Sequence, residues 1–392
     1  MKVLITTDWY APVINGVVTS VINLEKQLIE RGHEVKIVTL SKNAHSYVEG
    51  NVTYLASIGI GCIYPEARLK VLTRSKLIRD LIEWKPDIIH SQCEFSTFFL
   101  AKKIKNALQI PMVHTYHTIY EDYTHYFSPR KKWGKEVVEF LTRRLSYQVD
   151  ALIAPSEKIS HLLKGYEVVC PVEVIPSGIE RKKYELEKQK EWKTKIRQQF
   201  HISDDQTVLL YVGRLAKEKN IEEILAYQKQ MQQYGTILLI VGDGPYREAL
   251  ENRTKELELE ESVIFTGMIA PEEVGNYYQA GDLFVSASNS ETQGLTYAEA
   301  LASGMPLLCR RDACLKNVVM DGINGWQYES EEEFQENLLQ WQAKKEEEKQ
   351  ALCEEARRSS KMFSSEVFAE RIEQLYIQVL KERKPFVSFS YL

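Results

Sequence analysis

The sequence predicts an α/β protein of two domains, each built around a doubly wound parallel sheet. Its 392 residues exceed what one typical hydrophobic core organises, so two domains are expected. Short, continuous apolar runs alternate with amphipathic helical stretches, as they do where buried parallel strands are joined by crossover helices. The alternation breaks off near Gly178 and restarts beyond a highly charged stretch, which places the domain junction there.

The pattern at the beginning of the chain predicts one strand–helix–strand unit. Val3–Thr6 is predicted to be a buried strand, 8–16 a loop, Val18–Arg31 an amphipathic helix that Gly32 ends, and Val35–Leu40 the next strand. A unit of this kind builds a parallel sheet with right-handed crossovers. The same pattern predicts further strands of the first domain at Asp87–His90, Pro111–His114 and Ala151–Ala154.

The second domain repeats the alternation after the segment VEVIPSGI, residues 172–179. We expect the first domain to span 1–177 and the second 178–372, with 373–392 packing back on the first. Ligands of open parallel sheets bind beyond the carboxyl ends of the strands, so the cleft that two such domains face is the expected site. The predicted elements are strands at Val208–Val212, Ile237–Val241, Val263–Thr266 and Leu283–Ser286, a helix from Ile221, and a last helix at Ser365–Glu382.

The composition is that of an ordinary soluble globular protein, with 44% apolar and 27% charged residues. The amino terminus lacks a signal-peptide pattern, and no stretch reaches the ~18 uncharged apolar residues that a membrane span needs. The scattered cysteines include no C-x-x-C pair, which favours reduced thiols over disulfides or a zinc site; they are Cys62, Cys93, Cys170, Cys309, Cys314 and Cys353. A cytoplasmic location is expected.

The most informative segment is SNSETQGLTYAEALASGMP, residues 288–306. It places Glu291 in a loop, Gly294 at a turn, and Glu299 on a helix that begins near Leu295. The N–H groups and the dipole at the start of a helix favour a phosphate. Glu299, one turn further on, is placed to accept hydrogen bonds from ribose hydroxyls. Taken alone, Glu299 is also explained as an ordinary acidic residue on a helix surface with no role in ligand binding.

A second segment, YVGRLAKEKN, follows the first strand of the second domain. Arg214 and Lys219 are predicted to project from this strand-end loop, where cations neutralise a diphosphate and the charge that builds on it as a bond breaks. Without the glutamate pair, Arg214 and Lys219 are explained equally well as two solvated basic residues that bind no ligand. Gly213 in this loop and Gly242 in the later string VGDGP are turn glycines at strand ends. No DxD-like acid pair occupies a suitable loop, so no metal is expected.

These segments resemble the large family of glycosyltransferases with two Rossmann-like domains, the GT-B architecture, and within it the retaining family-four group. Glu291 and Glu299 match the family's Glu-x7-Glu signature in the context GLxxxEALASGxP. The resemblance runs over nearly the whole chain. It implies that Glu291 contacts the donor sugar, Glu299 contacts the ribose, and Arg214 and Lys219 stabilise the departing nucleoside diphosphate. Gly213 and Gly242 are further candidate donor-binding residues, since VGDGP recurs in the family near the nucleotide, although a plain tight turn explains it equally well.

In the first domain, the resemblance implies roles for two loop residues. Gly16, in DWYAPVINGV, belongs to the loop that closes over the donor, where a missing side chain permits close approach. His117 lies just past the carboxyl end of its strand, where the family has a His that contacts the donor sugar near the reacting carbon. A plain turn glycine and a structural His are the alternatives, and His114 fits a core or partner role better.

A narrower resemblance, to bacterial diacylglycerol glucosyltransferases, rests on the strings HSQCEFS at 90–96 and HTYHTxYEDYxxY at 114–126. It implies a lipid acceptor, for which Tyr120, Glu121 and Tyr123 are the candidate contacts.

Two departures from the family pattern are visible. Residues 177–180 read Ser-Gly-Ile-Glu where the family usually has Asn-Gly-Ile-Asp. Thr292 and Gln293 follow the first acid of the signature, where Ser or Thr and Phe are commoner, and this leaves the donor sugar open.

Two basic stretches of the first domain favour an anionic membrane surface as a partner. Residues 1–178 carry 22 Lys and Arg against 18 Asp and Glu, and the rest of the chain 28 against 37, giving +4 and −9. The stretch 129–144 sets basic residues beside an apolar stripe, and a second basic helix is predicted at Arg68–Arg79. Both helices also fit packing on their own sheet with the basic residues in water. The membrane candidates are Lys131, Lys132, Trp133, Lys135, Arg143 and Arg144.

The resemblance therefore implies a peripheral enzyme at the inner face of the cell membrane that moves a hexose from UDP-glucose to a lipid such as diacylglycerol. No cofactor beyond the nucleotide sugar and no nucleic-acid partner is expected, and the oligomeric state stays open. The alternatives are transfer to a soluble sugar, a thiol precursor or a surface polysaccharide, a UDP-sugar epimerase of the same architecture, and a non-catalytic binding protein.

Overall fold

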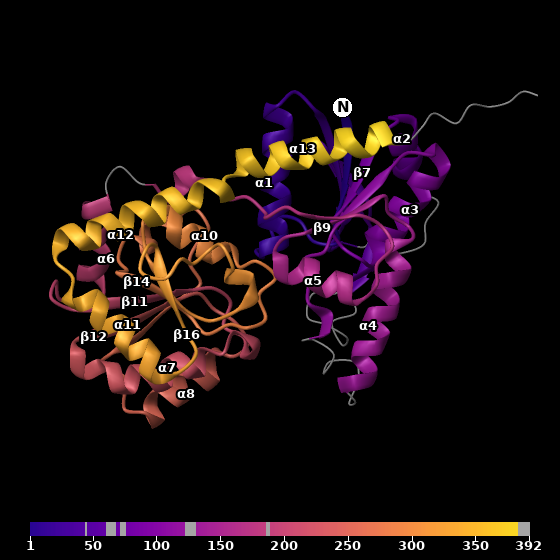
Figure 1. Ribbon diagram of the computed structural model, residues 1–392. Helices are drawn as coiled ribbons and strands as arrows, with labels where there is room; N and C mark the ends of the chain where they lie inside the picture. Colours follow the sequence, from indigo (N-terminus) through magenta and orange to yellow (C-terminus); the bar gives the residue numbers. More distant parts are fainter. Residues whose placement is uncertain (44, 60–67, 71–75, 122–130, 186–188, 383–392) are drawn as a thin grey trace, which may run out of the picture. The chain divides into compact units, whose positions relative to one another are not determined.

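The computed structural model of the chain describes residues 1–43, 45–59, 68–70, 76–121, 131–185 and 189–382 (Figure 1). The chain divides into two compact units. The first contains Met1–Gly178 together with the segment that starts at Ser365, and the second contains Ile179–Ser364.

The sheet of the first unit is parallel except at one edge. Within the described residues its strands are β1 (Lys2–Thr6), β2 (Glu34–Leu40), β3 (Tyr47–Glu49), β4 (Val52–Leu55), β7 (Ile88–Ser91), β8 (Met112–Thr115), β9 (Ala151–Ala154) and β10 (Val172–Val174). Their order is β10-β9-β8-β7-β1-β2-β4-β3, and β3 runs antiparallel to β4. The strand order reverses between β1 and β7, so the loops that follow these two strands meet at a topological switch point.

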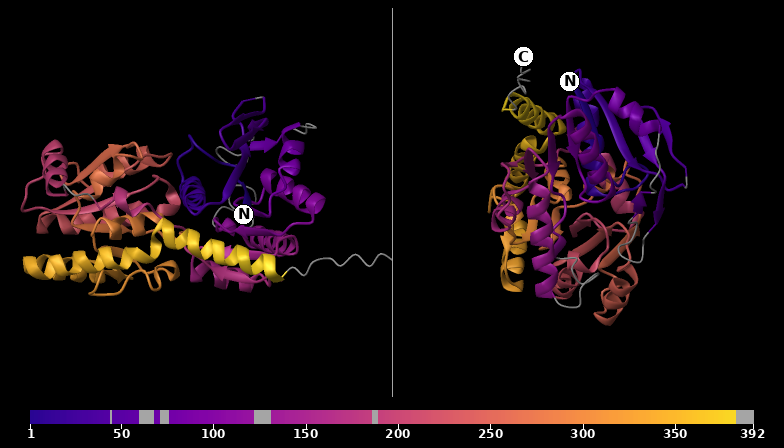
Figure 2. Two further views of the ribbon diagram at one scale, coloured as in Figure 1. Left: turned by 90° about the horizontal axis from the view of Figure 1, so that it is seen from above. Right: turned by 90° about the vertical axis from the view of Figure 1, so that its right-hand side faces the viewer.

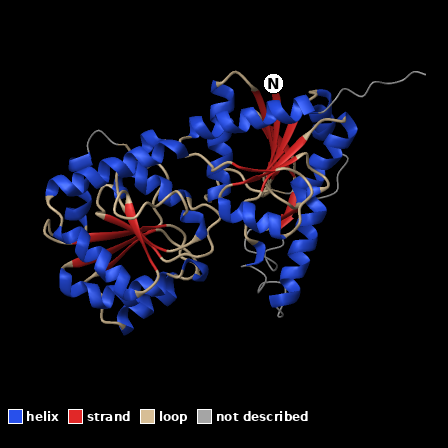
Figure 3. Cartoon of the chain, in the orientation of Figure 1, coloured by secondary structure: helices blue, strands red, loops and turns tan. Residues whose placement is uncertain are grey.

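Helices cover both faces of this sheet, as the blue helices around the red strands in Figure 3 show. They are α1 (Gly16–Glu30), α2 (Lys76–Glu83), α3 (Ser96–Leu108), α4 (Lys131–Ser146), α5 (Glu157–Gly165) and α13 (Ser365–Glu382). Successive side chains of a strand point to opposite faces. Val3 and Ile5 therefore pack with α1 and α13, while Leu4 packs with α3 and α5.

The final helix, α13, follows the second unit in sequence but packs on the first (Figure 2). Ile372 and Tyr376 on its inner face are fully buried with residues of α1. Glu373 pairs with Arg31 at 2.5 Å and with His33 at 3.0 Å. Burial of the apolar stripe and this ion pair together hold α13 against α1.

The sheet of the second unit is fully parallel. Its strands are β11 (Thr207–Val212), β12 (Thr236–Val241), β13 (Val263–Gly267), β14 (Leu283–Ser286), β15 (Leu307–Arg310) and β16 (Gly325–Tyr328). The order β13-β12-β11-β14-β15-β16 is that of a Rossmann-like domain, with its switch point between β11 and β14. The helices are α6 (Gln189–Gln199), α7 (Ile221–Met231), α8 (Arg247–Glu256), α9 (Val274–Tyr278), α10 (Leu295–Ala302), α11 (Glu331–Ala343) and α12 (Glu346–Ser359).

The predicted fold class, two doubly wound parallel-sheet α/β domains, is confirmed. One predicted element is wrong: Arg68–Arg79 is not a single basic helix. Arg68 begins the short strand β6 (Arg68–Lys70), which pairs with β5 (Ser57–Gly59), and the helix α2 starts only at Lys76. The guanidinium of Arg68 donates to the backbone oxygens of Ser41 and Ser57, and these bonds hold the strand.

Candidate active site

Two charged side chains meet at the switch point of the second unit. Lys219 ends a 3-10 turn in the loop after β11, and Glu291 lies in the loop after β14. Lys219 Nζ lies 2.5 Å from Glu291 Oε1, with 20% and 17% of the two side chains exposed. Because β11 and β14 are neighbours in the sheet, their loops bring these residues together across 72 positions of sequence.

Arg214 lies in the same loop as Lys219 but is more open, with 46% of its side chain exposed. Its guanidinium pairs with Glu218, whose carbonyl oxygen accepts a hydrogen bond from Ser290 at 3.2 Å. The Ser290 bond ties the two loops together. Arg214 therefore adds a second, solvent-accessible cation to this edge of the sheet.

The loops after β11 and β12 pack against each other so closely that glycine is required. Gly242 has a φ of +136°, and a Cβ on it would lie 2.0 Å from the carbonyl oxygen of Gly213. No side chain fits at that distance. Gly242 therefore fixes the position of the loop that carries Arg214 and Lys219. This structural role does not depend on any contact between Gly242 and a ligand.

The helix α10 begins directly after the Glu291 loop. Gly294, with a φ of +74°, precedes its first residue, Leu295. The first N–H groups of a helix have no partner within the helix, and the helix dipole adds positive potential there. The start of α10 therefore lies beside the charged pair as a further group suited to an anion.

Glu299, one turn into α10, is held by two tyrosines. Tyr278 donates its hydroxyl to Glu299 Oε2 at 2.8 Å, and the hydroxyl of Tyr184 forms a second hydrogen bond with the same carboxylate. Burial raises the pKa of Glu299 above its ordinary value. A carboxylate accepts about four hydrogen bonds, so this fixed group keeps the capacity to accept from a ligand hydroxyl.

In the first unit, the predicted residues Gly16 and His117 follow β1 and β8. Gly16 opens α1, whose first turn is capped by Asn15 Oδ1 accepting from the N–H of Val18 at 2.9 Å. His117 Nε2 lies 2.7 Å from Gln92 Oε1, so the proton of the neutral ring sits on Nε2. Burial lowers the pKa of His117 to about 4, which keeps the ring neutral at physiological pH.

The predicted acceptor residues that the structure describes are both engaged. Tyr120 donates its hydroxyl to Glu94, and Glu121 accepts from the hydroxyl of Tyr166. Glu121 also pairs with Lys135 at 3.3 Å. These bonds hold Tyr120 and Glu121 in place after β8.

The helix α4 presents two different faces. Val138 and Leu145 are buried in the core of the first unit. Trp133, Phe140 and Leu141 are 58%, 61% and 58% exposed. The apolar stripe seen in the sequence is thus only partly used for packing, and three large apolar side chains stay on the surface.

The basic residues at the end of α4 differ from one another. Arg143 donates to the carbonyl oxygen of Tyr166 and pairs with Glu139 and Glu167, which gives it a structural role. Arg144 is exposed. Tyr123 lies outside the described residues, and only the backbone of Lys131 and Lys132 is described.

Sequence reasoning missed four residues that hold the predicted ones: Gln92, Glu94, Tyr184 and Tyr278. A signal existed for the first two, because they follow β7 at the switch point of the first sheet. Tyr278 ends α9 and Tyr184 follows the 3-10 turn Arg181–Lys183, and both reach Glu299 through tertiary packing, for which the sequence gives no local signal.

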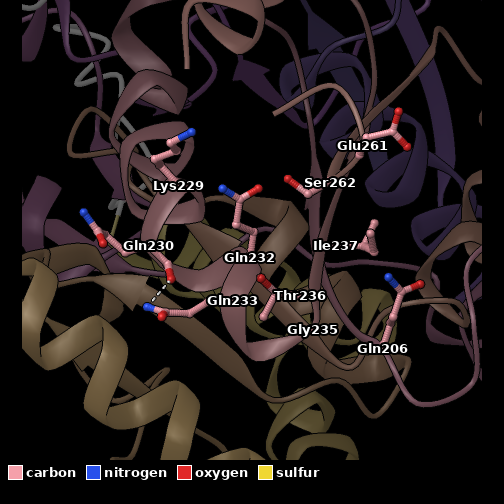
Figure 4. A pocket seen from close by; sticks show the side chains of 10 residues that line it. All are labelled: Gln206, Lys229, Gln230, Gln232, Gln233, Gly235, Thr236, Ile237, Glu261 and Ser262. Carbon is pink, nitrogen blue, oxygen red and sulfur yellow. Dashed lines mark hydrogen bonds between the residues drawn. The ribbon is translucent and has the colours of Figure 1, made fainter. Parts of the chain in front are cut away.

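A hollow in the second unit lies away from these residues (Figure 4). It is lined by Gly235 and Thr236 at the amino end of β12 and by Ser262, which precedes β13. The charged groups described above follow the carboxyl ends of β11 and β14, at the opposite edge of the sheet. In the part of the chain that is described, no three His, Cys, Asp or Glu side chains gather to hold a metal ion, and no helix is both long and apolar enough to cross a bilayer.

The fold and the site together define a glycosyltransferase of the GT-B class. Residues 14–183 match the family model described as Glycosyltransferase Family 4, and residues 193–359 match the model described as Glycosyl transferases group 1. The chain is 38% identical over 344 residues to the alpha-monoglucosyldiacylglycerol synthase of Streptococcus pneumoniae, covering 87% of this chain and 78% of that protein. It is 31% identical over 394 residues to the enzyme of the same name from Acholeplasma laidlawii, covering 97% and 98%. The chain belongs to glycosyltransferase family 4.

Solved structures agree on the fold. The chain superimposes on Anabaena Alr3699/HepE in complex with UDP with a TM-score of 0.74 at 18% identity, covering 96% of this chain and 100% of that one. Sucrose-phosphate synthase from Thermosynechococcus elongatus gives 0.75 at 20% identity, covering 97% and 99%. At these identities the likeness bears on the fold alone.

Proposed function

We propose that this protein is a retaining glucosyltransferase that moves glucose from UDP-glucose to a lipid acceptor of the diacylglycerol type. The single observation that carries the proposal is the ion pair between Lys219 and Glu291 at the switch point of the second sheet. It is supported by the identity to two proteins named alpha-monoglucosyldiacylglycerol synthase over most of the chain.

The second unit is the donor-binding part in this proposal. Arg214, Lys219 and the first N–H groups of α10 bind the diphosphate, and Glu299 accepts hydrogen bonds from the ribose. When the bond between the anomeric carbon and the phosphate oxygen breaks, negative charge builds on the diphosphate, and the two cations stabilise it. The ammonium of Lys219 has three N–H donors, so it can serve both Glu291 and a phosphate oxygen.

Glu291, held in place by Lys219, accepts a hydrogen bond from a hydroxyl of the transferred sugar. The acceptor hydroxyl attacks the anomeric carbon from the face that the diphosphate leaves, and its proton passes to the departing phosphate oxygen. Configuration at that carbon is then kept. The product named for the two relatives is alpha-linked, which fits retention from a donor whose glucose is alpha-linked to the diphosphate.

The first unit binds the acceptor and faces the membrane. Trp133, Phe140 and Leu141 of α4 insert into the interface of the bilayer, while Arg144 and Lys135 face anionic headgroups. Gly16 and the neutral His117 lie on this unit and are the residues for which we propose a contact with the donor sugar. The protein thus works as a peripheral enzyme on the inner face of the cell membrane.

A matrix of donors and acceptors tests the proposal. UDP-glucose, UDP-galactose and GDP-mannose are each combined with diacylglycerol, a glycolipid and soluble sugars, and product masses are read. Hexosyl diacylglycerol from UDP-glucose is expected, with an alpha linkage by proton coupling. Products formed only on soluble sugars would overturn the lipid acceptor, and a beta linkage would overturn retention.

A further inference from the structure

Glu94 lies in the first unit at a place where parallel sheets commonly bind ligands. It follows β7, directly at the switch point where the loops after β1 and β7 meet. Ligands of parallel sheets bind at such points. Its side chain is 14% exposed, so it is largely enclosed but still reaches the surface.

Two hydrogen-bond donors fix this carboxylate. Tyr120 donates its hydroxyl to Glu94 Oε2, and His114 Nε2 lies 3.2 Å from Glu94 Oε1. Each carboxylate oxygen accepts about two hydrogen bonds. One donor on each oxygen therefore leaves each oxygen able to accept one more.

The tautomer of His114 follows from burial. The ring is fully buried, and its Nδ1 has no partner within the described residues. A proton on Nδ1 would bury an unsatisfied N–H, so the proton sits on Nε2 and faces Glu94. His114 therefore donates a hydrogen bond from Nε2 to Glu94 Oε1.

Glu94 has no Lys or Arg within ion-pair distance in the part of the chain described. Asp8, its acidic neighbour, is already satisfied: its Oδ1 accepts from the N–H of Thr97 at 2.8 Å and from the hydroxyl of Thr97 at 2.6 Å. A fixed carboxylate that keeps free acceptor capacity is suited to a ligand that donates hydrogen bonds.

The residues beside Glu94 are apolar and exposed. Phe95 directly precedes α3 and is 48% exposed, and Phe99 lies in the first turn of α3 and is 69% exposed. The edge of the Phe95 ring contacts the ring of Tyr120, with centroids 5.8 Å apart, so Phe95 borders the polar cluster directly. The polar cluster that holds Glu94 thus borders one exposed aromatic side chain, Phe95, and Phe99 follows one turn further along α3, where its backbone N–H donates to the carbonyl oxygen of Phe95.

We propose that Glu94 binds the hydroxyl of the lipid acceptor and that Phe95 and Phe99 contact the start of its acyl chains. This inference rests on the proposed function and names the acceptor subsite within it. Glu94 orients the hydroxyl by accepting its hydrogen bond, and Tyr120 and His114 are positioning residues that hold the carboxylate.

Kinetics of the Glu94→Gln variant test the assignment. The variant should raise the KM for diacylglycerol about 10- to 100-fold, because a hydrogen bond to a charged group is worth about 1.5–3 kcal/mol. UDP affinity by calorimetry and the slow hydrolysis of UDP-glucose without acceptor should stay unchanged. Glu157→Gln, on the exposed surface of α5, is the matched control.

Phe99→Ser provides a second test that leaves the polar cluster intact. It should raise the KM for long-chain diacylglycerol several-fold but leave a short-chain, water-soluble diacylglycerol little changed. A wild-type KM for both lipids in both variants overturns the inference while leaving the proposed function standing. If the wild-type protein itself forms no lipid product, the proposed function fails and the inference fails with it.

Discussion

The ammonium of Lys219 lies 2.5 Å from the carboxylate of Glu291, although the two residues are 72 positions apart. Each comes from a loop that follows one of two neighbouring strands, β11 and β14. The pair neutralises both charges in the absence of a donor. A bound diphosphate would share the ammonium with Glu291, because the ammonium has three N–H donors, and Glu291 would stay in place to accept from the sugar.

Lys219→Met should reduce the rate of sugar transfer strongly. Loss of one preorganised group that stabilises developing charge costs about 100- to 1000-fold in kcat. Steady-state transfer of radiolabelled glucose measures the change. Lys217→Met, an exposed lysine of the same 3-10 turn, should stay near the wild-type rate. Equal losses in both variants would contradict a specific role of Lys219.

Gly242→Ala should destabilise the second unit more than its backbone angle alone explains. A left-handed residue other than glycine costs about 1–2 kcal/mol, and here the new Cβ would also lie 2.0 Å from the carbonyl oxygen of Gly213. Gly322→Ala separates the two effects, because Gly322 has a φ of +74° but nothing within 4 Å. Thermal unfolding should show a clearly larger loss for Gly242→Ala. Equal losses would mean that the close approach relaxes freely.

Tyr278→Phe should weaken UDP binding by about five- to tenfold, since it removes one net hydrogen bond of about 1 kcal/mol that positions Glu299. Inorganic pyrophosphate, which lacks the ribose, should bind unchanged. Calorimetry with both ligands separates ribose recognition from diphosphate recognition. The control is Tyr246→Phe, because Tyr246 is a half-buried tyrosine of the same unit whose hydroxyl donates to Glu222 at 2.7 Å. A parallel loss of pyrophosphate binding in Tyr278→Phe would point instead to general disorder of the site.

The stability of the protein should fall as the pH drops from 6.5 to 4, partly because of His117. Burial lowers the pKa of His117 from 6.5 to about 4, so the unfolded chain binds more protons than the folded protein in this window. His117→Gln should reduce that loss by about 1–3 kcal/mol when unfolding free energies at pH 7 and pH 4.5 are compared. The exposed His161, changed to Gln, should leave the loss as it is. An unchanged pH dependence in His117→Gln would argue against a neutral ring with a lowered pKa.

Replacement of both Trp133 and Phe140 by Ser should lower binding to anionic vesicles by at least about tenfold, because each large apolar side chain contributes about 1.5–3 kcal/mol on burial. Co-sedimentation with vesicles of defined anionic content measures it. Met268→Ser removes an equally exposed apolar side chain, 64% exposed, from the second unit and should bind normally. Unchanged binding of the double variant would exclude α4 as the membrane face.

The amino-acid sequence by itself determined where most strands and helices lie. A buried parallel strand is a continuous apolar run, such as Leu283–Ser286, and this signal is local. The sequence also marked Lys219, Glu291 and Glu299 as candidates, because glycine turns and helix starts are local as well. Arg68 shows the limit of local signals. Its basic neighbourhood suggested a helix, but its guanidinium donates hydrogen bonds to the backbone oxygens of Ser41 and Ser57, and these bonds hold it in a strand.

Only the tertiary structure decided which side chains meet. The order of the strands brings the loop of Lys219 beside the loop of Glu291, and the packing of α9 brings Tyr278 to Glu299. The same holds for Glu94 with Tyr120 and His114. Local periodicity shows which face of an element is buried, but contacts between distant segments depend on strand order and on the packing of whole elements, which no short stretch of sequence encodes.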